Sequence, residues 1–370
     1  MTKNITTHPT KAFAQPRQSN IELLRLVCMF FIVLQHVIKV AVYPEIQGNG
    51  SWTCGSYIGA IVLGMVCTAV NCFILISGFF GIKFKLRSLF NLYAICAFYN
   101  LLAYGVHIGL DEAHIGKSLI LNTIFPFSHS SYWFINCYVQ LFCFAPLLNF
   151  AIDNTNRRQH LGIIALLTFT NIYLGHIWQS DLYDNQGMCT LHFLYLYVVG
   201  RYLGKYISSS FIDSQRYKWL MLFIGCAALA GLMKYTEETG IFIKWMGLYN
   251  NSLLMMGGAI GLLLFAQSFH FQSRFVNVVA VSTLAIYLGH EHVYVRPHLY
   301  NYIISLQTRY LNTDLVLHDT VGRICLAIGC SLIICIFFLL FDRIRLLLMK
   351  PIWKIYDKIE PRIMRLIPRE

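Results

Sequence analysis

Residues 19–40 have the sequence SNIELLRLVCMFFIVLQHVIKV, an apolar run that contains Arg25 and His36. At about 100° per residue, the step from Arg25 to His36 amounts to roughly three turns, so both side chains lie on one face of a helix, about 16 Å apart along its axis. Glu22 and Lys39 lie within about 60° of that face. Ionisable groups in hydrocarbon are costly and usually face a protein interior or a water-lined cavity, where they serve chemistry or transport. This stretch therefore predicts a membrane-spanning helix with a functional face.

The composition of the whole chain is that of a polytopic membrane protein. Only 12% of its 370 residues are charged and 57% are hydrophobic, whereas soluble domains have about 25% charged residues. Apolar segments and short connections use almost the whole length, so any activity must be built from membrane helices and their loops. The net charge of +12 is concentrated in alternate loops and at the C-terminus, which indicates membrane orientation rather than nucleic-acid binding.

The hydropathy pattern predicts an all-α fold with about ten transmembrane helices. We expect them near residues 21–41, 58–80, 89–109, 131–152, 161–178, 188–205, 217–234, 247–269, 276–296 and 319–341. Lys and Arg collect in both tails and in every second loop, so both termini are expected in the cytoplasm. The predicted parts are a cytoplasmic N-terminal tail (1–20), a transmembrane domain (21–342) and a basic amphipathic cytoplasmic tail (343–370), which is expected to lie on the anionic inner leaflet.

Two interpretations of Arg25 and His36 are open at this point. In the first, Arg25 reaches the inner headgroups or pairs with Glu22 one turn away, and His36 is a hydrogen-bonded core residue. In the second, the cation near the cytoplasmic end and the imidazole deeper in the bilayer serve a ligand that enters from the cytoplasm and reacts part-way across the membrane. Motifs elsewhere in the chain favour the second interpretation.

Four segments resemble bacterial acyltransferase family 3, whose members are membrane proteins that O-acetylate envelope carbohydrates. The first, IELLRLVCMFFIVLQH, has the family's arginine, ten residues and histidine, and the second, NCFILISGFFGIK, contains its Ser-Gly-Phe element (residues 77–79). The third, SYWFINCYVQLFCFAPLL, resembles the Trp-Phe segment, with Tyr132 where an aliphatic residue is commoner. The fourth, STLAIYLGHEHVYVRP, resembles the Tyr-Leu-x-His stretch at residues 287–290. The ten-helix layout extends the resemblance over essentially the whole chain.

The resemblance implies an integral membrane O-acyltransferase of the bacterial inner membrane. It would transfer an acyl group, usually acetyl from acetyl-CoA, to a hydroxyl of an envelope glycan or a lipid-linked saccharide. We expect no tightly bound cofactor, with acetyl-CoA as the donor substrate. A hydroxyl is a poor nucleophile until a base removes its proton, and a neutral imidazole suits that task near pH 7. His36 is the predicted base, and a transient acyl-imidazole is the other role left open.

Coenzyme A carries several phosphates, so its site needs cations. The predicted donor-binding cations are Arg25, which is also expected in the catalytic site with His36, and the cluster Lys83, Lys85 and Arg87 directly after Ser-Gly-Phe. The same cluster is also typical of an orientation signal. Ser77 and Gly78 are predicted donor-binding residues because a glycine lets a ligand approach closely, although it equally lets another helix approach.

The candidate acceptor-binding residues are aromatic and polar side chains near the outer ends of two predicted helices: Trp133, Tyr138, His290 and Glu291. An aromatic belt at the membrane interface is the simpler explanation of Trp133 and Tyr138. A hydrogen-bonded helix interface is the simpler explanation of His290 and Glu291, and assistance to His36 by one of them is a further role left open. We predict no metal site, because His290 and His292 point about 160° apart on one helix and cannot hold the same ion.

The alternative function is a transporter, flippase or polymerase of lipid-linked oligosaccharides, since buried charges and about ten spans are normal there as well. Such a transporter usually has paired repeats with broken helices, and such a polymerase a large outer loop; we find neither pattern in the sequence. The expected partners are therefore acyl-CoA, a carbohydrate or lipid-linked glycan acceptor, the lipid bilayer and an envelope-assembly protein, and no nucleic acid.

Overall fold

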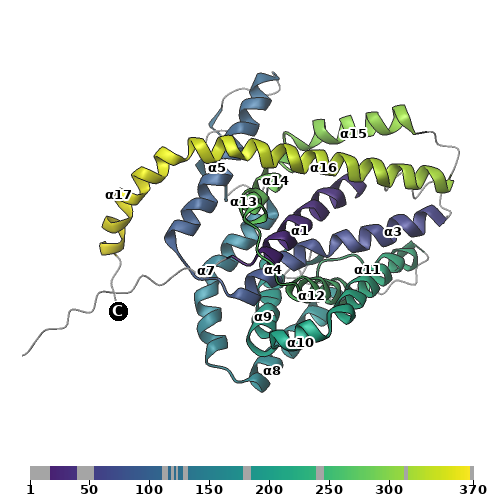
Figure 1. The fold of residues 1–370 in the computed structure, drawn as a ribbon, viewed down its shortest axis with the longest axis horizontal. Coiled ribbons are helices and arrows are strands. Elements are labelled where there is room, and N and C mark those ends of the chain that lie inside the picture. Colours follow the sequence, from purple (N-terminus) through teal and green to yellow (C-terminus); the bar gives the residue numbers. More distant parts are fainter. Residues whose placement is uncertain are drawn as a thin grey trace, which may run out of the picture.

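The computed structural model describes residues 17–39, 54–110, 116–117, 121, 124–127, 132–177, 185–238, 246–311 and 316–366. These residues form helices and connections without a β-strand among them, so the all-α prediction is confirmed (Figure 1). Most of the predicted N-terminal tail, residues 1–16, lies outside the described residues. The division into a membrane domain and two tails stays a prediction.

The helical elements follow in chain order. They are α1 (Ser19–Val37), α3 (Cys54–Cys67), α4 (Ala69–Phe80), α5 (Leu86–Gly109), α7 (Trp133–Asp153), α8 (Arg157–Thr170), the π-helical η2 (Asn171–Ile177), the short 3-10 turn η3 (Asn185–Gly187), α9 (Thr190–Tyr206), α10 (Ser209–Ser214), α11 (Arg216–Glu238), α12 (Leu253–Gln267), α13 (Arg274–Val279), the 3-10 turn η5 (Ala280–Ser282), α14 (Thr283–His290), α15 (Arg296–Tyr310), α16 (Val316–Leu348) and α17 (Lys350–Leu366).

Helices occupy all ten places that the hydropathy pattern predicts. In the described part of the chain, seven helical segments are long and apolar enough to cross a membrane, and two apolar ones, Leu253–Gln267 and Arg274–His290, are shorter. Inside a bilayer each backbone amide must find a partner within the protein, which a helix provides for itself. The chain is therefore a multi-pass helical protein, while the number of ten spans and the side of the termini stay predictions. Two described helices, α10 and α15, were not predicted.

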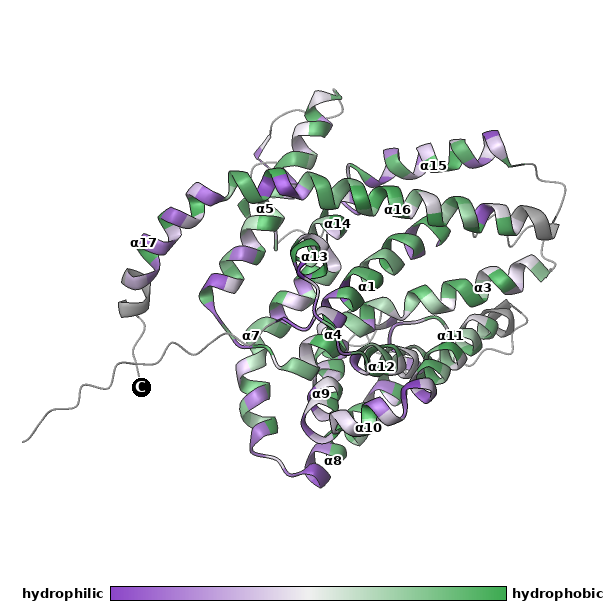
Figure 2. Cartoon of the chain, in the orientation of Figure 1, coloured by the Kyte–Doolittle hydropathy of each residue, from purple (hydrophilic) through white to green (hydrophobic). Residues whose placement is uncertain are grey.

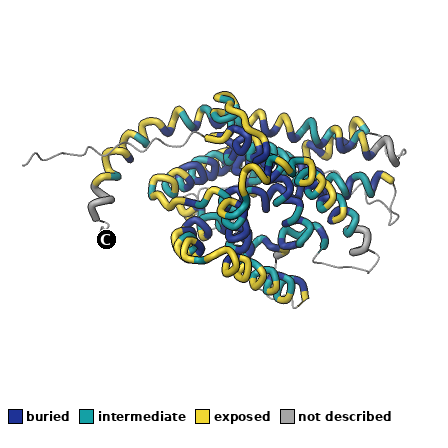
Figure 3. The backbone as a smooth tube through the Cα atoms, turned by 60° about the horizontal axis from the view of Figure 1, so that its bottom comes forward, coloured by how far each residue is buried: buried dark blue, intermediate teal, exposed yellow. Residues whose placement is uncertain are grey.

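Buried residues gather in the middle of the bundle, where α1 packs against α4, α14 and α16 (Figure 3). The C-terminal helix α17 extends away from the bundle beyond the end of α16 (Figure 1). Figure 2 shows hydrophilic and hydrophobic residues mixed along α17, whereas most of α16 is hydrophobic. This mixture is the pattern expected of the amphipathic tail, and its contact with the inner leaflet stays a prediction.

Close contact between α4 and α9 depends on small residues. A Cβ atom on Gly78 would lie 2.4 Å from the carbonyl oxygen of Tyr197, and one on Gly200 would lie 2.5 Å from the carbonyl oxygen of Leu75. Such backbone approach is the usual role of glycine between membrane helices. Gly78 therefore packs α4 onto α9, and this contact fixes the position of Ser77 on the neighbouring face.

The chain from Arg274 to His290 is not one regular helix. The 3-10 turn η5 separates α13 from α14, and its residues Ala280 and Ser282 are buried. At the other end of this segment, the Tyr132 hydroxyl donates a hydrogen bond to the Leu288 carbonyl at 2.6 Å. The contact joins α14 to the start of α7, so both helices present their side chains to the same interior space.

Candidate active site

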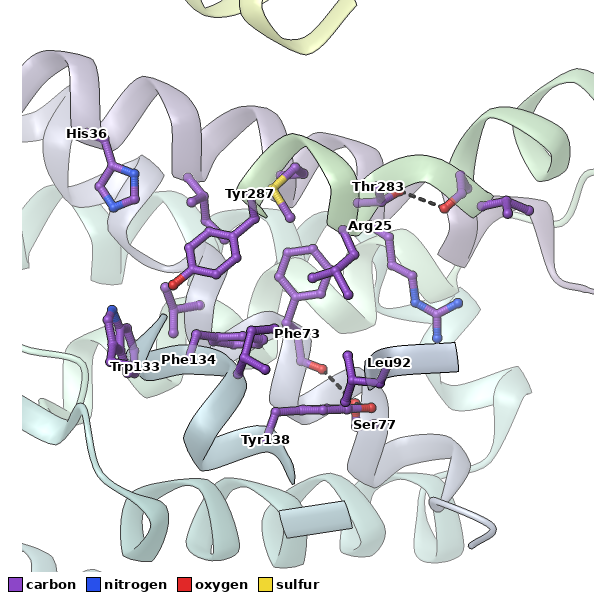
Figure 4. Close-up of a pocket in the computed structure, with 17 residues that line it drawn as sticks. Arg25, His36, Phe73, Ser77, Leu92, Trp133, Phe134, Tyr138, Thr283 and Tyr287 are labelled. Atoms are coloured by element: carbon purple, nitrogen blue, oxygen red, sulfur yellow. Dashed lines mark hydrogen bonds between the residues drawn. The ribbon is translucent and has the colours of Figure 1, made fainter. Parts of the chain in front are cut away.

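One face of α1 lines an interior cavity of about 290 Å³. Arg25, Met29, Ile32 and His36 follow one another at helical spacing on this face. Helices α4, α5, α7 and α14 and the turn η5 supply the remaining walls (Figure 4). Their lining residues are Val70, Phe73, Ser77, Leu92, Trp133, Phe134, Ile135, Tyr138, Ala280, Val281, Thr283, Leu284 and Tyr287.

Arg25 and His36 stand at opposite ends of this cavity (Figure 4). Arg25 Nη1 lies 2.7 Å from Glu22 Oε1, and the Glu22 side chain is nearly buried, with 8% of it exposed. The ion pair lets the arginine stay partly inside the protein, since an isolated charge there is unfavourable. Arg25 therefore combines both interpretations of the sequence: it pairs with Glu22 and it lines the cavity.

His36 is held by two groups from the end of α14. Its Nδ1 atom lies 3.2 Å from Glu291 Oε2 and 3.1 Å from His290 Nε2. His290 Nδ1 lies 2.6 Å from the Ile286 carbonyl oxygen, which can only accept, so His290 carries its proton on Nδ1 and offers Nε2 as an acceptor. Since both neighbours of His36 Nδ1 are acceptors, a neutral His36 has its proton on Nδ1 and a lone pair on Nε2, which no described residue engages.

Glu291 is in turn fixed by α15. Its Oε1 atom accepts from Arg296 Nη1 at 2.9 Å, and its Oε2 atom accepts from the Tyr300 hydroxyl at 3.0 Å. Three donors, from His36, Arg296 and Tyr300, converge on the Glu291 carboxylate, and the ion pair with Arg296 favours its charged form. The carboxylate therefore stays ionised beside His36. It can orient the imidazole and stabilise a positive charge on it, as a carboxylate does beside a histidine base.

His292 directly follows Glu291 in the sequence but is not part of the cluster of His36, His290 and Glu291. Its ring contacts Tyr104 and Tyr132, and its Nδ1 atom accepts from the backbone amide of Tyr294 at 3.3 Å. His290 and His292 therefore face different surroundings, but the reason differs from the predicted one, because α14 ends at His290 and His292 lies beyond the helix.

A metal ion is the other occupant that this cluster could hold. One ligand atom from each of His36, His290 and Glu291 lies within 4.8 Å of the other two. Arg296 contacts the same carboxylate and disfavours a cation there. The hydrogen bonds described above already engage His36 Nδ1, His290 Nε2 and both carboxylate oxygens of Glu291. The absence of a metal therefore stays a prediction, which can be tested by metal removal.

The predicted donor-binding and acceptor-binding residues do not all line the cavity. Ser77, Trp133 and Tyr138 line it, and Ser77 Oγ lies 3.5 Å from the Tyr138 hydroxyl. Gly78 does not line it and instead contacts α9. His290 is fully buried behind His36 and is not a lining residue.

The cluster Lys83, Lys85 and Arg87 lies away from the cavity. All three residues are exposed, and none lines it. Arg87 forms ion pairs with Asp357 and Glu360 of α17, and its guanidinium group stacks over the Trp353 ring at 4.8 Å. Arg87 therefore fastens α17 to the start of α5. A contact of the cluster with the donor stays a prediction.

The residues that sequence reasoning missed are Arg296 and Tyr300 on α15 and the cavity residues Phe73 and Phe134. Arg296 follows Glu291 by five residues and Tyr300 follows it by nine. A turn at residues 293–295 separates α14 from α15, and this connection brings both side chains within reach of Glu291. No sequence motif predicts this turn. Phe73 and Phe134 lie in runs of apolar residues, and hydropathy alone does not distinguish a cavity-lining position there from its neighbours.

Comparison with known proteins gives one match. The model of a family described as an acyltransferase domain matches residues 18–341. The matched range includes the whole cavity, Glu291 and α15, and it ends before α17. Neither the curated proteins nor the solved structures contain a match to this chain.

Proposed function

The chain belongs to acyltransferase family 3, and on that premise we propose that it moves an acetyl group from acetyl-CoA to a hydroxyl of a cell-envelope glycan or lipid-linked saccharide. That it is a membrane acyltransferase follows from the family and the apolar helices. The acetyl donor, the carbohydrate acceptor and the bacterial inner membrane as its location are parts of the proposal. The proposal also includes an envelope-assembly protein as a partner. It includes no nucleic acid and no tightly bound cofactor.

The observation that carries the proposal is the pairing of His36 with Glu291 at the edge of the cavity that Arg25 also lines. A buried carboxylate on Nδ1 and a free Nε2 are what an imidazole needs to act as a general base. A hydrogen-bonded core histidine needs neither a cavity nor an oriented carboxylate. The arrangement therefore supports a reacting role for His36.

In the proposed reaction, His36 Nε2 takes the proton of the acceptor hydroxyl. The hydroxyl oxygen forms an ester bond with the thioester carbonyl carbon, and the carbon–sulfur bond breaks. The departing coenzyme A thiolate then receives the proton from the imidazolium. Glu291 stabilises the imidazolium between these two steps, and Arg296 and Tyr300 keep Glu291 in position.

A second order of events uses the same atoms. His36 Nε2 first attacks the thioester carbonyl carbon, the carbon–sulfur bond breaks, and the coenzyme A thiolate leaves an acyl-imidazolium beside Glu291. The acceptor hydroxyl oxygen then displaces the imidazole from the acetyl group, and the hydroxyl proton passes to the thiolate. In that order the acetyl group is transiently attached to the protein. Rapid quenching with labelled acetyl-CoA in the absence of acceptor tells the two apart, because only the second order leaves label on the chain.

Arg25 is assigned to donor binding rather than to the reacting carbon. It is about 16 Å from His36 along α1, so the two residues cannot touch the same carbonyl group. Trp133 and Tyr138 are assigned to the acceptor, because their rings line the cavity and aromatic faces suit the apolar faces of a sugar ring. Glu291 and His290 act through His36, as positioning residues.

The test of the proposal is mass spectrometry of envelope glycans from cells with and without this chain. The expected result is the loss of acetyl groups from one glycan in cells that lack the chain. Unchanged acetylation of every envelope glycan would reject the proposal. A transporter or flippase, the alternative function, would change the amount of a glycan on the outer surface without changing its acetyl content.

A further inference from the structure

A second cavity, of about 620 Å³, adjoins the first one at Val281, which lines both. It lies at the start of α1, because Arg17 lines it and the Ser19 hydroxyl donates a hydrogen bond to Asn277 Oδ1 (3.0 Å), another lining residue. From Ser19 to His36 is a distance of about 26 Å along a helix axis. The two cavities therefore follow α1 along almost its whole length and suit an elongated ligand.

Three arginines from separate parts of the chain line the second cavity. Arg17 precedes α1, Arg274 begins α13 and Arg343 lies in α16. No acidic residue lines this cavity, and within the described residues none of the three arginines is paired with a carboxylate. Arg343 Nη2 donates to the Val278 carbonyl at 3.2 Å, which holds it beside the cavity.

This concentration of positive charge suits an anion with several phosphates. Like charges that converge on one cavity repel one another, and a bound anion removes that repulsion. Guanidinium groups match phosphate oxygens with paired hydrogen bonds. The side chains of Gln272 and Asn277 add amide groups that can hydrogen-bond to a nucleotide.

We propose that the arginine-lined cavity binds the phosphorylated nucleotide end of acyl-CoA. The inference rests on the proposed function, because the other end of the same molecule reacts at His36. Coenzyme A has its phosphates at one end, its thioester at the other and a long narrow arm between them. With the phosphates on Arg17, Arg274 and Arg343, the arm passes Arg25 and brings the thioester carbonyl to His36.

This site differs from the cluster that sequence reasoning assigned to the donor. Arg87 is engaged by Asp357 and Glu360, whereas Arg274 and Arg343 face a cavity next to the one that holds His36. The headgroup of an anionic lipid offers the same phosphate chemistry. The two cavities share a boundary at Val281, which favours acyl-CoA, because the thioester of acyl-CoA must reach His36 and a lipid headgroup need not.

The first test measures equilibrium binding of CoA to the purified full-length chain in nanodiscs of zwitterionic lipid. The variants are Arg274→Gln, Arg343→Gln and the two together. The matched control is Arg158→Gln, which removes an exposed arginine that lines neither cavity. Each single substitution should weaken CoA binding about ten-fold, the double variant should weaken it further, and the control should change it less than about two-fold. Unchanged affinity in the double variant would overturn the proposal.

The second test compares donors. S-acetyl-pantetheine has the same thioester as acetyl-CoA and no nucleotide phosphates. The wild-type chain should prefer acetyl-CoA in kcat/KM, and the double variant should lose about ten-fold or more of this preference. A merely structural defect lowers kcat/KM for both donors and leaves their ratio unchanged, and that result would contradict the site.

Two further outcomes distinguish a CoA site from a lipid site, and the CoA site from the proposed acetyl transfer. Native mass spectrometry that finds phosphatidylglycerol bound to the wild-type chain and lost from the double variant, with CoA affinity unchanged, would assign the cavity to a lipid and overturn the proposal. Arginine-dependent CoA binding by a chain that transfers acetyl from no donor would uphold the nucleotide site while the proposed transfer fails.

Discussion

Glu291 Oε2 lies 3.2 Å from His36 Nδ1, and this contact joins the first helix of the bundle to the residue that ends α14. The two residues are 255 positions apart in sequence, so only the assembled bundle brings them together. The pair gives the imidazole a fixed proton on Nδ1 and a free Nε2. It is the feature of the fold on which the proposed acetyl transfer depends.

Replacement of Glu291 by Gln should reduce kcat about 100-fold, with little change in KM for acetyl-CoA. The amide has nearly the shape of the carboxylate, but it is neutral and can present an N–H group to Nδ1, which favours the wrong tautomer of His36. The rates are measured as label transferred from acetyl-CoA to envelope glycan in membrane vesicles. The control is Glu360→Gln, which removes a carboxylate that contacts Arg87 far from His36. A Glu291→Gln variant with the wild-type kcat would remove Glu291 from the mechanism.

Replacement of Arg25 by Gln should raise KM for acetyl-CoA about ten-fold and affect kcat less. The arginine lines the cavity but is too far from His36 to act on the thioester carbon, so its loss weakens donor binding. Initial rates over a range of acetyl-CoA concentrations give both constants. An unchanged KM would show that Arg25 serves only its ion pair with Glu22.

Replacement of Gly78 by Ala should destabilise the bundle by about 1–3 kcal/mol, because the new Cβ would lie 2.4 Å from the Tyr197 carbonyl oxygen. The measurement is the thermal midpoint of the detergent-purified chain, which should fall by several degrees. Gly105→Ala on α5 is the matched control, since nothing lies within 4 Å of its added Cβ atom. A midpoint equal to that of the control would mean that α4 and α9 can separate without cost.

Removal of divalent metals should leave acetyl transfer intact. His36, His290 and Glu291 satisfy one another by hydrogen bonds, and Arg296 already contributes a positive charge to the carboxylate. The check is activity after treatment with a strong chelator, followed by metal analysis of the protein. Loss of activity that added Zn²⁺ restores would establish a metal at this cluster and change the role of His36.

The helices were predictable from the sequence because the bilayer imposes a simple pattern. An apolar run must pair its own backbone in hydrocarbon, so each of the ten predicted places is helical. The number of spans is less well determined by hydropathy alone, because the segments Leu253–Gln267 and Arg274–His290 are apolar but short. Helix α15 was missed because its sequence, RPHLYNYIISLQTRY, is too polar to be read as a span.

The shared face of Arg25 and His36 followed from their spacing, because residues eleven apart on a helix point in nearly the same direction. Assistance to His36 by His290 or Glu291 was one of the roles that the sequence left open, but the contact itself did not follow from it. Glu291 and His292 are adjacent polar residues, and only the end of α14 and the turn after it direct the carboxylate to His36 and His292 to the rings of Tyr104 and Tyr132. Likewise, the contact between Arg87 and Asp357 of α17 joins residues that are 270 positions apart, and no local sequence pattern predicts it.

The most direct test of the account is transfer of radiolabelled acetyl from acetyl-CoA to envelope glycan by the His36→Ala variant. The account predicts a fall of at least about 100-fold, to the level of membranes without the chain, while membrane insertion and thermal midpoint stay those of the wild type. Transfer at the wild-type rate by a correctly inserted His36→Ala chain would contradict it.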